Sequence, residues 1–385
     1  MQTISMVKNC CGCKACVQAC PKGCISIKKD TEGFDFPSIN DADCIKCGKC
    51  YKVCAQVGYE WFHTVKNTYA ALHKNRDVLM NSTSGGAMTS IAEQVLEREG
   101  AVFGTILDTS DWCAKFVKID SMENLGLLRG SKYVQSDTSD IYSQVKKELH
   151  QGREVVFVGV PCQVAGLYKY IGKNKVDNLI TIDILCHGTP SPTLFQEHIS
   201  YIEKKYKMKL TNFMFRDKAI FPNKTALRYE FGSKKKYILG RCEPYYNAFI
   251  SGSAYRMCCY ECQYATAERV GDITLGDYWG IKHFHPEFDN SNGVSLVLVN
   301  TEKGYQYLNK AKLSLTQSML SNAMVGNGIL NGPSTKARCR EHFYKDVNIN
   351  GYKHAIKDNI KNYPMIYNII LTHMPRKLIK ILSRI

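Results

Sequence analysis

The sequence predicts an α/β protein (α+β over the whole chain) with a small cysteine-rich module followed by a mixed, largely parallel-sheet domain. Two observations lead to this prediction. Ten of the 18 cysteines fall between residues 10 and 54. From residue 67 onward, short apolar runs typical of strands alternate with stretches of helical periodicity, an order that favours a parallel sheet covered by helices. A chain of 385 residues has room for two or three such domains.

The cysteine-rich module contains two copies of the run C-x2-C-x2-C-x3-C. Four thiolates at this spacing hold a 4Fe-4S cluster, and in two-cluster ferredoxins the fourth cysteine of each run binds the other cluster. The module is therefore predicted to be a two-cluster bacterial ferredoxin fold over residues 1–60. Cys11 and Cys24 are left over and are expected to be bystanders. The predicted ligands are Cys10, Cys13, Cys16 and Cys54 for a first cluster, and Cys44, Cys47, Cys50 and Cys20 for a second.

Composition narrows the class of protein. Cysteines in cluster spacing favour a reduced, cytoplasmic protein over a disulfide scaffold. The first ligand, at residue 10, leaves no space for a signal peptide, and no apolar run approaches the ~18 residues that span a bilayer. The formal charge of +16 overstates the positive charge of the cofactor-loaded protein, because bound clusters and a diphosphate cofactor add negative charge. The remaining charge could attract an acidic donor, an anionic substrate or a membrane surface. Scattered Lys and Arg without a nucleic-acid motif predict no nucleic-acid partner.

The second domain is predicted to span residues 65–345 and a basic helical tail residues 346–385. Asp137 is expected to cap the helix at 137–150. Residues 301–345 are expected to be mostly helical. Strands are expected at 68–73, 101–107, 114–119, 154–160, 178–185, 212–216, 226–232, 236–239, 272–275 and 294–299, and helices at 87–99, 137–150, 162–170 and 192–206.

Two polar segments have the composition of a site for an anionic cofactor. Residues 82–86 precede a helix, where free amides and the helix dipole suit a pyrophosphate. Ser and Thr also simply cap helices, so this segment alone leaves both interpretations open. Residues 129–135 combine cations, a glycine, hydroxyls and an aromatic ring, which suits a flavin or phosphate contact but also a polar loop. The candidate contacts are Ser84, Gly85, Gly86, Arg129, Ser131, Lys132 and Tyr133.

Cysteines in the second domain indicate a third cluster. Cys162 and Cys186 each follow a buried strand, and the carboxyl ends of parallel strands meet at one edge of a sheet. Cys259-x2-Cys262 adds a pair with metal-ligand spacing. A zinc site at this pair and buried structural thiols are the alternatives. The predicted ligands are Cys162, Cys186, Cys259 and Cys262; Cys258 could replace Cys259, and Cys242 is a weaker candidate.

Further candidates for the cofactor and for catalysis lie near these cysteines. Residues 269–280 end a strand with two acids, two glycines and an indole, which suits a flavin ring and an acid that orients substrate, or alternatively a tight turn. Residues 215–218 are either a charged surface turn or a grip on an anion. His187, Asp277 and Lys218 are the candidates for proton donation or substrate orientation. Gly159, Pro161, Gln163 and Trp279 complete the candidate cofactor contacts.

Taken in order, these motifs resemble the family of coenzyme F-420 hydrogenase/dehydrogenase beta subunits. The resemblance covers roughly residues 1–345, including a fused ferredoxin module, and is strongest to compact bacterial members of the kind found in surface-polysaccharide gene clusters. It implies FAD, iron–sulfur clusters and flavin-mediated electron transfer. Archaeal members of the family exchange hydride with the deazaflavin coenzyme F-420. The matching segments are 84–86, 129–135, 159–167, 186–188, 215–218, 259–262 and 272–280.

The predicted function is therefore that of an iron–sulfur flavoprotein oxidoreductase. Electrons would pass between a low-potential donor such as ferredoxin, the clusters, FAD and a small-molecule acceptor, because a flavin joins one-electron to two-electron chemistry. Direction is open, since cluster potentials span a wide range. A non-enzymatic electron-transfer subunit that feeds a partner enzyme and a deazaflavin dehydrogenase are the alternatives. The basic, aliphatic segment 363–385 could contact a membrane surface or be an ordinary packing helix.

Overall fold

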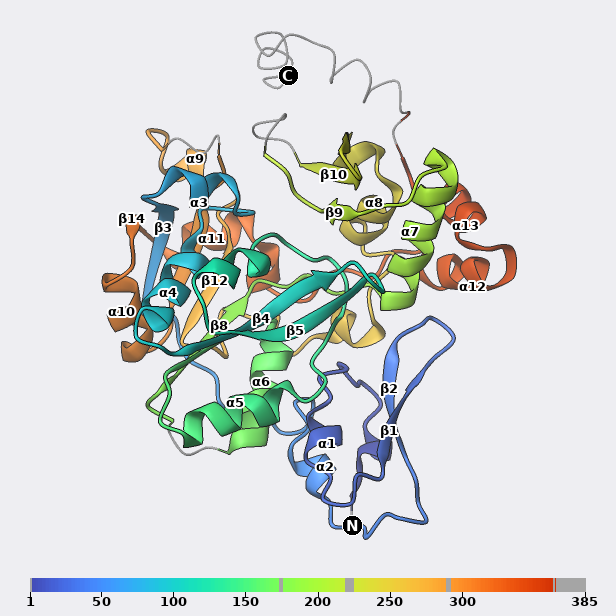
Figure 1. Cartoon of the computed structure of the whole chain (residues 1–385), viewed down its shortest axis with the longest axis horizontal. Coiled ribbons are helices and arrows are strands. Elements are labelled where there is room, and N and C mark those ends of the chain that lie inside the picture. Colours follow the sequence, from blue (N-terminus) through green and yellow to red (C-terminus); the bar gives the residue numbers. More distant parts are fainter. Residues whose placement is uncertain (1, 173–175, 219–224, 289–291, 363, 365–385) are drawn as a thin grey trace.

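The computed structural model describes residues 2–172, 176–218, 225–288, 292–362 and 364. The cysteine-rich module lies at one end of the molecule, with the amino terminus (Figure 1). Its two strands, β1 (Ile25–Lys29) and β2 (Asp35–Ile39), form an antiparallel hairpin. Two short helices, α1 (Ala15–Gln18) and α2 (Lys49–Lys52), carry the third cysteine of each run. The repeat in the sequence is thus a repeat in structure, as a two-cluster ferredoxin fold requires.

A large mixed sheet forms the body of the second domain. Its strand order is β14-β3-β13-β12-β8-β7-β4-β5-β6. The central strands β12, β8, β7 and β4 run parallel. Strands β14, β3 and β13 pair antiparallel with their neighbours, and β5 pairs antiparallel with β4 and parallel with β6. The parallel centre confirms the α/β prediction and places the carboxyl ends of β7 and β8 side by side. The bounds are β3 (Asn67–His73), β4 (Ala101–Asp108), β5 (Cys113–Ile119), β6 (Ser136–Asp137), β7 (Val155–Gly159), β8 (Leu179–Ile184), β12 (Ile273–Asp277), β13 (Ser295–Val299) and β14 (Leu313–Ser318).

Helices cover both faces of this sheet. On one face, α4 (Ala87–Leu96) and α10 (Glu302–Asn309) bury apolar side chains against the central strands. On the other face lie α5 (Ile141–His150) and α6 (Pro161–Ile171). Cys13 and Ala15 of the module belong to the same apolar core as α5 and α6, so the module packs directly onto this helical layer (Figure 1). Shorter helices α3 (Arg76–Met80), α9 (Ile281–Phe284) and α11 (Leu320–Gly326) lie near β3.

A smaller sheet forms a separate unit beside the large one. Strands β9 (Asn212–Met214), β10 (Ala226–Phe231) and β11 (Lys234–Leu239) are antiparallel and belong to neither edge of the large sheet. They share an aromatic-rich core with the surrounding helices. These helices are α7 (Pro192–Tyr206), α8 (Pro244–Ile250), α12 (Arg340–Asn350) and α13 (Tyr352–Asn359).

Several expected elements differ in the structure. Helix α5 begins at Ile141, and Asp137 does not cap it but lies in β6, where its carboxylate accepts a 2.7 Å hydrogen bond from Lys14 Nζ. Residues 313–318, expected to be helical, form β14, because each of them pairs antiparallel with a residue of β3 at the edge of the sheet. No helix among the described residues is long and apolar enough to cross a membrane. Apart from Pro364, the segment 363–385 lies outside the described residues.

Candidate metal centres and cofactor site

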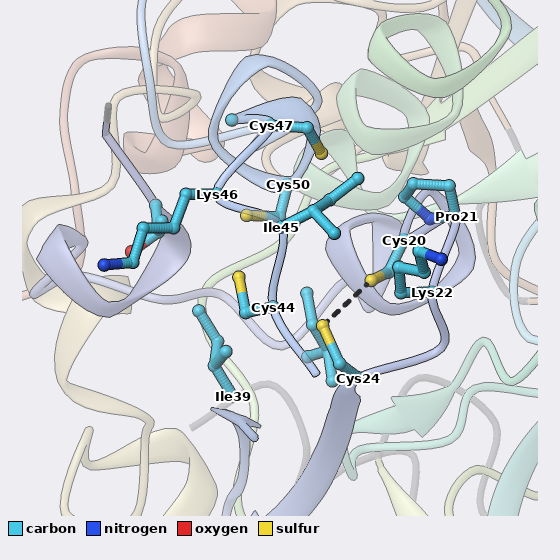
Figure 2. A pocket seen from close by; sticks show the side chains of 13 residues that line it. Cys20, Pro21, Lys22, Cys24, Ile39, Cys44, Ile45, Lys46, Cys47 and Cys50 are labelled. Atoms are coloured by element: carbon cyan, nitrogen blue, oxygen red, sulfur yellow. Dashed lines mark hydrogen bonds between the residues drawn. The ribbon is translucent and has the colours of Figure 1, made fainter. Parts of the chain in front are cut away.

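One cysteine-lined cavity lies at the tip of the module. Cys44, Cys47 and Cys50 of the second run line it together with Cys20 of the first run. Figure 2 shows their sulfur atoms facing a common space, with Cys24 beside them. The sulfur atoms of Cys20 and Cys24 are 3.4 Å apart. The fourth cysteine of the first run therefore reaches the other run's cavity, as the ferredoxin spacing predicts.

A second cavity in the module shows the reciprocal arrangement. Cys10, Cys13, Cys16 and Cys54 line it, together with the leftover Cys11. The amide of Gly12 lies 3.3 Å from Cys10 Sγ, so a backbone donor already faces a sulfur atom. Such N–H groups stabilise the negative charge of a thiolate-bound cluster.

The donors in both cavities fit a 4Fe-4S cluster. Each cavity is lined by the four predicted ligands and one further cysteine, around roughly 350 Å³ of space, part of it open solvent. Burial raises the pKa of Cys54 to about 12 and also raises that of Cys16, so these thiols would not ionise at neutral pH without a positive partner. Bound iron would supply that charge. No three His, Cys, Asp or Glu side chains among the described residues are placed to hold a single metal ion.

The four cysteines predicted for a third cluster lie together. Cys162 begins α6, Cys186 follows β8, and Cys259 and Cys262 lie in and just after a 3-10 turn (Met257–Glu261). The pKa of Cys186 is raised mainly by burial and further by the negative charges of Cys259 and Cys262. The charges of Cys262 and Cys186 likewise contribute to raising the pKa of Cys162. The parallel strands thus bring the two strand-end cysteines to the 259–262 turn.

Cys11 lies at the same place, which the sequence did not reveal. Hydrogen bonds from the thiols of Cys13 and Cys162 hold the pKa of Cys11 well below its usual range. Cys11 therefore lies between a predicted ligand of the first cluster and one of the third. No spacing signal could have shown this, because the contact joins the module to α6. Cys242 is far from the group, in the core around the small sheet, where its thiol donates to Pro364 O (3.8 Å).

The two polar segments predicted to hold an anionic cofactor lie side by side. The amide of Ser131 donates a 2.8 Å hydrogen bond to Thr83 Oγ1. Lys218 Nζ donates to Ser84 O (2.7 Å) and to Leu79 O (2.9 Å), so a third predicted residue joins the same loop. Burial, and then the nearby Arg216, lower the pKa of Lys218 to about 8. An ammonium group has three donors, and these two hydrogen bonds use two of them, so the third N–H of Lys218 has no partner among the residues that the structure describes.

Asp277 and Trp279 adjoin this loop at the end of β12. The Asp277 carboxylate pairs with Arg216, and the Arg216 guanidinium lies 5.4 Å from the Trp279 ring centroid. The Trp279 side chain is 49% exposed. Burial lowers the pKa of His187, and the Asp277 charge opposes that shift, which places His187 near the same carboxylate. The sequence pattern indicated Asp277, Trp279, His187 and the segment 215–218 that contains Arg216, but not the pairing of Arg216 with Asp277, which lies 61 residues away.

Other predicted contacts have structural partners instead. Gln163 Oε1 accepts from the Val160 amide and its Nε2 donates to Ser136, so this side chain caps α6 between Gly159 and Pro161. Lys132 Nζ donates to the carbonyls of Leu127, Leu128 and Arg129.

A Cβ atom at Gly85 would lie 2.0 Å from Ala71 O, so Gly85 is needed for packing against β3. Arg129 Nε lies 3.4 Å from Thr89 Oγ1, and Gly86 precedes α4 at φ +84°.

The remaining predicted contact, Tyr133, turns toward the small sheet. Its ring stacks on Phe249 with centroids 4.3 Å apart and meets Phe215 edge-on. Phe215 is next to Arg216, so Tyr133 joins the 129–135 segment to the strand end that carries Arg216 and Lys218. The candidate site therefore lies where the large sheet meets the smaller unit.

Comparisons with known proteins match three segments of the chain. Models of the N-terminal and C-terminal parts of the coenzyme F-420 hydrogenase/dehydrogenase beta subunit match residues 68–142 and 152–319. A model of the 4Fe-4S dicluster domain matches residues 9–56. The chain is 26% identical over 190 residues to a subunit of the F(420)H(2) dehydrogenase of Methanosarcina mazei, and the match covers 46% of this chain. It covers 53% of that protein, so the chain spans about half the length of this curated relative.

A solved structure of the F-420-reducing NiFe hydrogenase complex from Methanosarcina barkeri contains a chain that superposes with a TM-score of 0.45 and 15% identity. The superposition covers 77% of this chain and 92% of that chain.

Proposed function

Because the chain belongs to the family of coenzyme F-420 hydrogenase/dehydrogenase beta subunits, we propose that it is an iron–sulfur flavoprotein oxidoreductase with three 4Fe-4S clusters and FAD. The family and the dicluster domain make it an electron-transfer oxidoreductase with iron–sulfur clusters. The third cluster, FAD and the roles of individual residues are part of the proposal. The proposed ligands are Cys10, Cys13, Cys16 and Cys54 for the first cluster and Cys20, Cys44, Cys47 and Cys50 for the second. Those of the third are Cys162, Cys186, Cys259 and Cys262.

One observation carries the proposal: the three cysteine groups form a continuous series from the module into the second domain. The two module cavities share the crossing of Cys20 and Cys54. Cys11 contacts both Cys13 and Cys162, which joins the first group to the third. The third group in turn includes Cys186, next to His187 at the candidate cofactor site. Electrons that enter at the module would thus reach the second domain through adjacent centres.

The candidate FAD site has suitable donors for an anionic cofactor with an aromatic ring. Arg216, Arg129 and the third N–H of Lys218 would bind phosphate or ring oxygens, and the half-exposed Trp279 would pack on a ring. Bound FAD would convert single-electron steps into two-electron chemistry. Asp277, held by Arg216, would orient substrate, and His187, neutral at pH 7 because of burial, could accept a proton at its ring nitrogen.

The donor and the acceptor belong to the same proposal. We propose ferredoxin or another low-potential protein as the donor, a small molecule as the acceptor, and a cytoplasmic location. On the resemblance to compact ferredoxin-fused bacterial members, we place the acceptor in surface-polysaccharide biosynthesis.

The test is anaerobic purification of the full chain followed by iron and FAD analysis and reduction by ferredoxin. The expected result is about twelve irons per chain, given four per cluster, and one FAD that is reduced through the clusters. Deazaflavin, nicotinamide, quinone and sugar nucleotide acceptors are then screened. A protein with full iron and no FAD would overturn the oxidoreductase proposal.

That outcome would favour the second candidate, a subunit that passes electrons to a partner enzyme. The printed name of the Methanosarcina mazei relative describes a subunit of a dehydrogenase, which gives this candidate its support. The two candidates differ in one measurable property, since only the first needs FAD within this chain.

A further inference from the structure

Three arginines are almost fully buried, and they differ in what neutralises them. Arg269 pairs with Asp183 at 2.8 Å, and Arg340 pairs with Glu32. Arg256 is 2% exposed and forms no ion pair with a carboxylate in the part of the chain that the structure describes. Burying an unpaired charge is costly, so a buried guanidinium needs a counter-charge close by.

The direct partners of Arg256 are all neutral. Its Nε donates to Cys10 O (2.6 Å), its Nη2 to Asp35 O (2.9 Å) and its Nη1 to Gln135 Oε1 (3.1 Å). The guanidinium also lies 4.0 Å from the ring centroid of Phe36. These contacts satisfy its N–H groups and join the module to the second domain, but they leave its charge uncompensated.

Cysteines of two predicted clusters lie close to Arg256, whereas the nearby Asp35 carboxylate is already paired with Lys14. The positive charge of Arg256 acts on Cys10 on the module side and on Cys258 and Cys259 on the other side. These residues border the first and third clusters of the proposed function. An oxidised 4Fe-4S cluster with four thiolates carries a net charge of about −2, and reduction adds one more negative charge.

We propose that Arg256 is a shared counter-charge for the first and third clusters and raises the reduction potential of both. This inference rests on the proposed function, because it requires those two clusters. Arg256 thereby becomes a positioning residue for electron transfer, which keeps the two adjacent centres easy to reduce. The second cluster supplies an internal reference, because the hydrogen bonds and ring contacts of Arg256 to described residues involve none of its predicted ligands, which are Cys20, Cys44, Cys47 and Cys50.

The experiment is an anaerobic redox titration of the full chain, followed by electron paramagnetic resonance. In Arg256→Gln, the first and third clusters are expected to become about tenfold harder to reduce at a given potential, equivalent to about −59 mV for one electron. The second cluster should keep its potential. Arg256→Lys retains the charge and should shift both potentials by less than half as much.

A second variant leaves Arg256 and its contacts in place. Gln135→Glu puts a carboxylate where the Gln135 amide oxygen accepts from Arg256, so it neutralises the guanidinium without removing it. The same downward shift of the first and third clusters is expected. This variant decides the matter if Arg256→Gln does not fold or does not incorporate iron. The control is Arg340→Gln, which removes a buried arginine already neutralised by Glu32 and should shift no cluster.

Unchanged first and third potentials in Gln135→Glu, or an equal shift of all three clusters, would overturn the inference. The proposed function fails separately: wild-type protein would then lack iron at the third site, whatever the variants do.

Discussion

The Cys13 sulfur lies against Gly166 of α6: a Cβ atom at position 166 would be 3.1 Å from Cys13 Sγ. It would also be 3.0 Å from the Tyr142 hydroxyl, so a side chain at position 166 could not avoid Cys13 by turning toward Tyr142. Helix α6 begins at Pro161, carries Cys162 in its first turn and, one turn later, leaves room for Cys13. A single helix therefore holds a predicted ligand of the third cluster near a predicted ligand of the first.

Gly166→Val is expected to displace Cys13 and to cost the first cluster. A branched side chain cannot be accommodated at a contact this tight without moving its neighbour. Iron should fall from about twelve to about eight per chain, with loss of the corresponding resonance signal. Gly328→Val is the matched control, since a Cβ atom there meets nothing within 4 Å. Full iron in Gly166→Val would show that Cys13 is not held by this contact.

Cys54→Ser should remove the first cluster and spare the second, although Cys54 belongs to the second run. The reason is that Cys54 lines the cavity of Cys10, Cys13 and Cys16. A Cys10→Ser, Cys54→Ser double variant should lose no more iron than either single variant, because both act on one cluster. A Cys47→Ser, Cys54→Ser double variant should lose about eight irons. Loss of about eight irons in the first double variant and of only about four in the second would mean that each run holds its own cluster.

The third cluster has its own variant. Cys259→Ser combined with Cys262→Ser should lower iron from about twelve to about eight per chain, while both module clusters remain. Cys242→Ser is the control, since Cys242 lies in the core of the smaller unit. Cys258→Ser decides between the two neighbouring cysteines and is expected to keep its iron. Unchanged iron in the double variant would eliminate the site.

Binding of FAD should depend on the charge of Lys218. Burial lowers the pKa of Lys218 to about 8, so the ammonium form prevails below that pH and the neutral form above it. An anionic ligand favours the charged form, so the affinity of FAD-free protein for FAD should fall as pH rises through about 8. Titration calorimetry between pH 6.5 and 9.5 measures this dependence.

Lys218→Met should bind more weakly at pH 7 and show no inflection near 8, whereas the exposed Lys353→Met should follow wild type. The same inflection in both variants would exclude Lys218 as its origin.

Most of the fold could be predicted because its signals are local. Helix 192–206 begins at Pro192, after the Ser191 cap, and ends where Lys207 adopts φ +52°. The residues that determine both ends of the helix are therefore adjacent to it in the sequence. The assignment of β9–β11 to a separate sheet depends on pairing across the chain, which alternation alone does not specify. Strand β14 was missed because an edge strand with polar positions has a weak pattern.

The site residues likewise fall into those that local spacing predicts and those that only the packing of distant segments brings together. Ligand spacing along the chain led directly to the module cysteines and to the pair at 259–262. The grouping of Cys11 with Cys162 and of Arg216 with Asp277 arises only when distant segments pack together. Residues named for their composition, such as Lys132 and Gln163, bind their own backbone neighbourhood instead, because short-range partners were available.

The crossing of Cys20 and Cys54 also sets an order of events during synthesis. The second cavity has all four sulfur atoms once the ribosome has added Cys50, and the first cavity once it has added Cys54. The third group must wait for Cys262, about two hundred residues later. A nascent chain could therefore receive its first iron while most of the protein is still unmade, and the finished module could serve as the surface on which α6 and the later cysteines assemble.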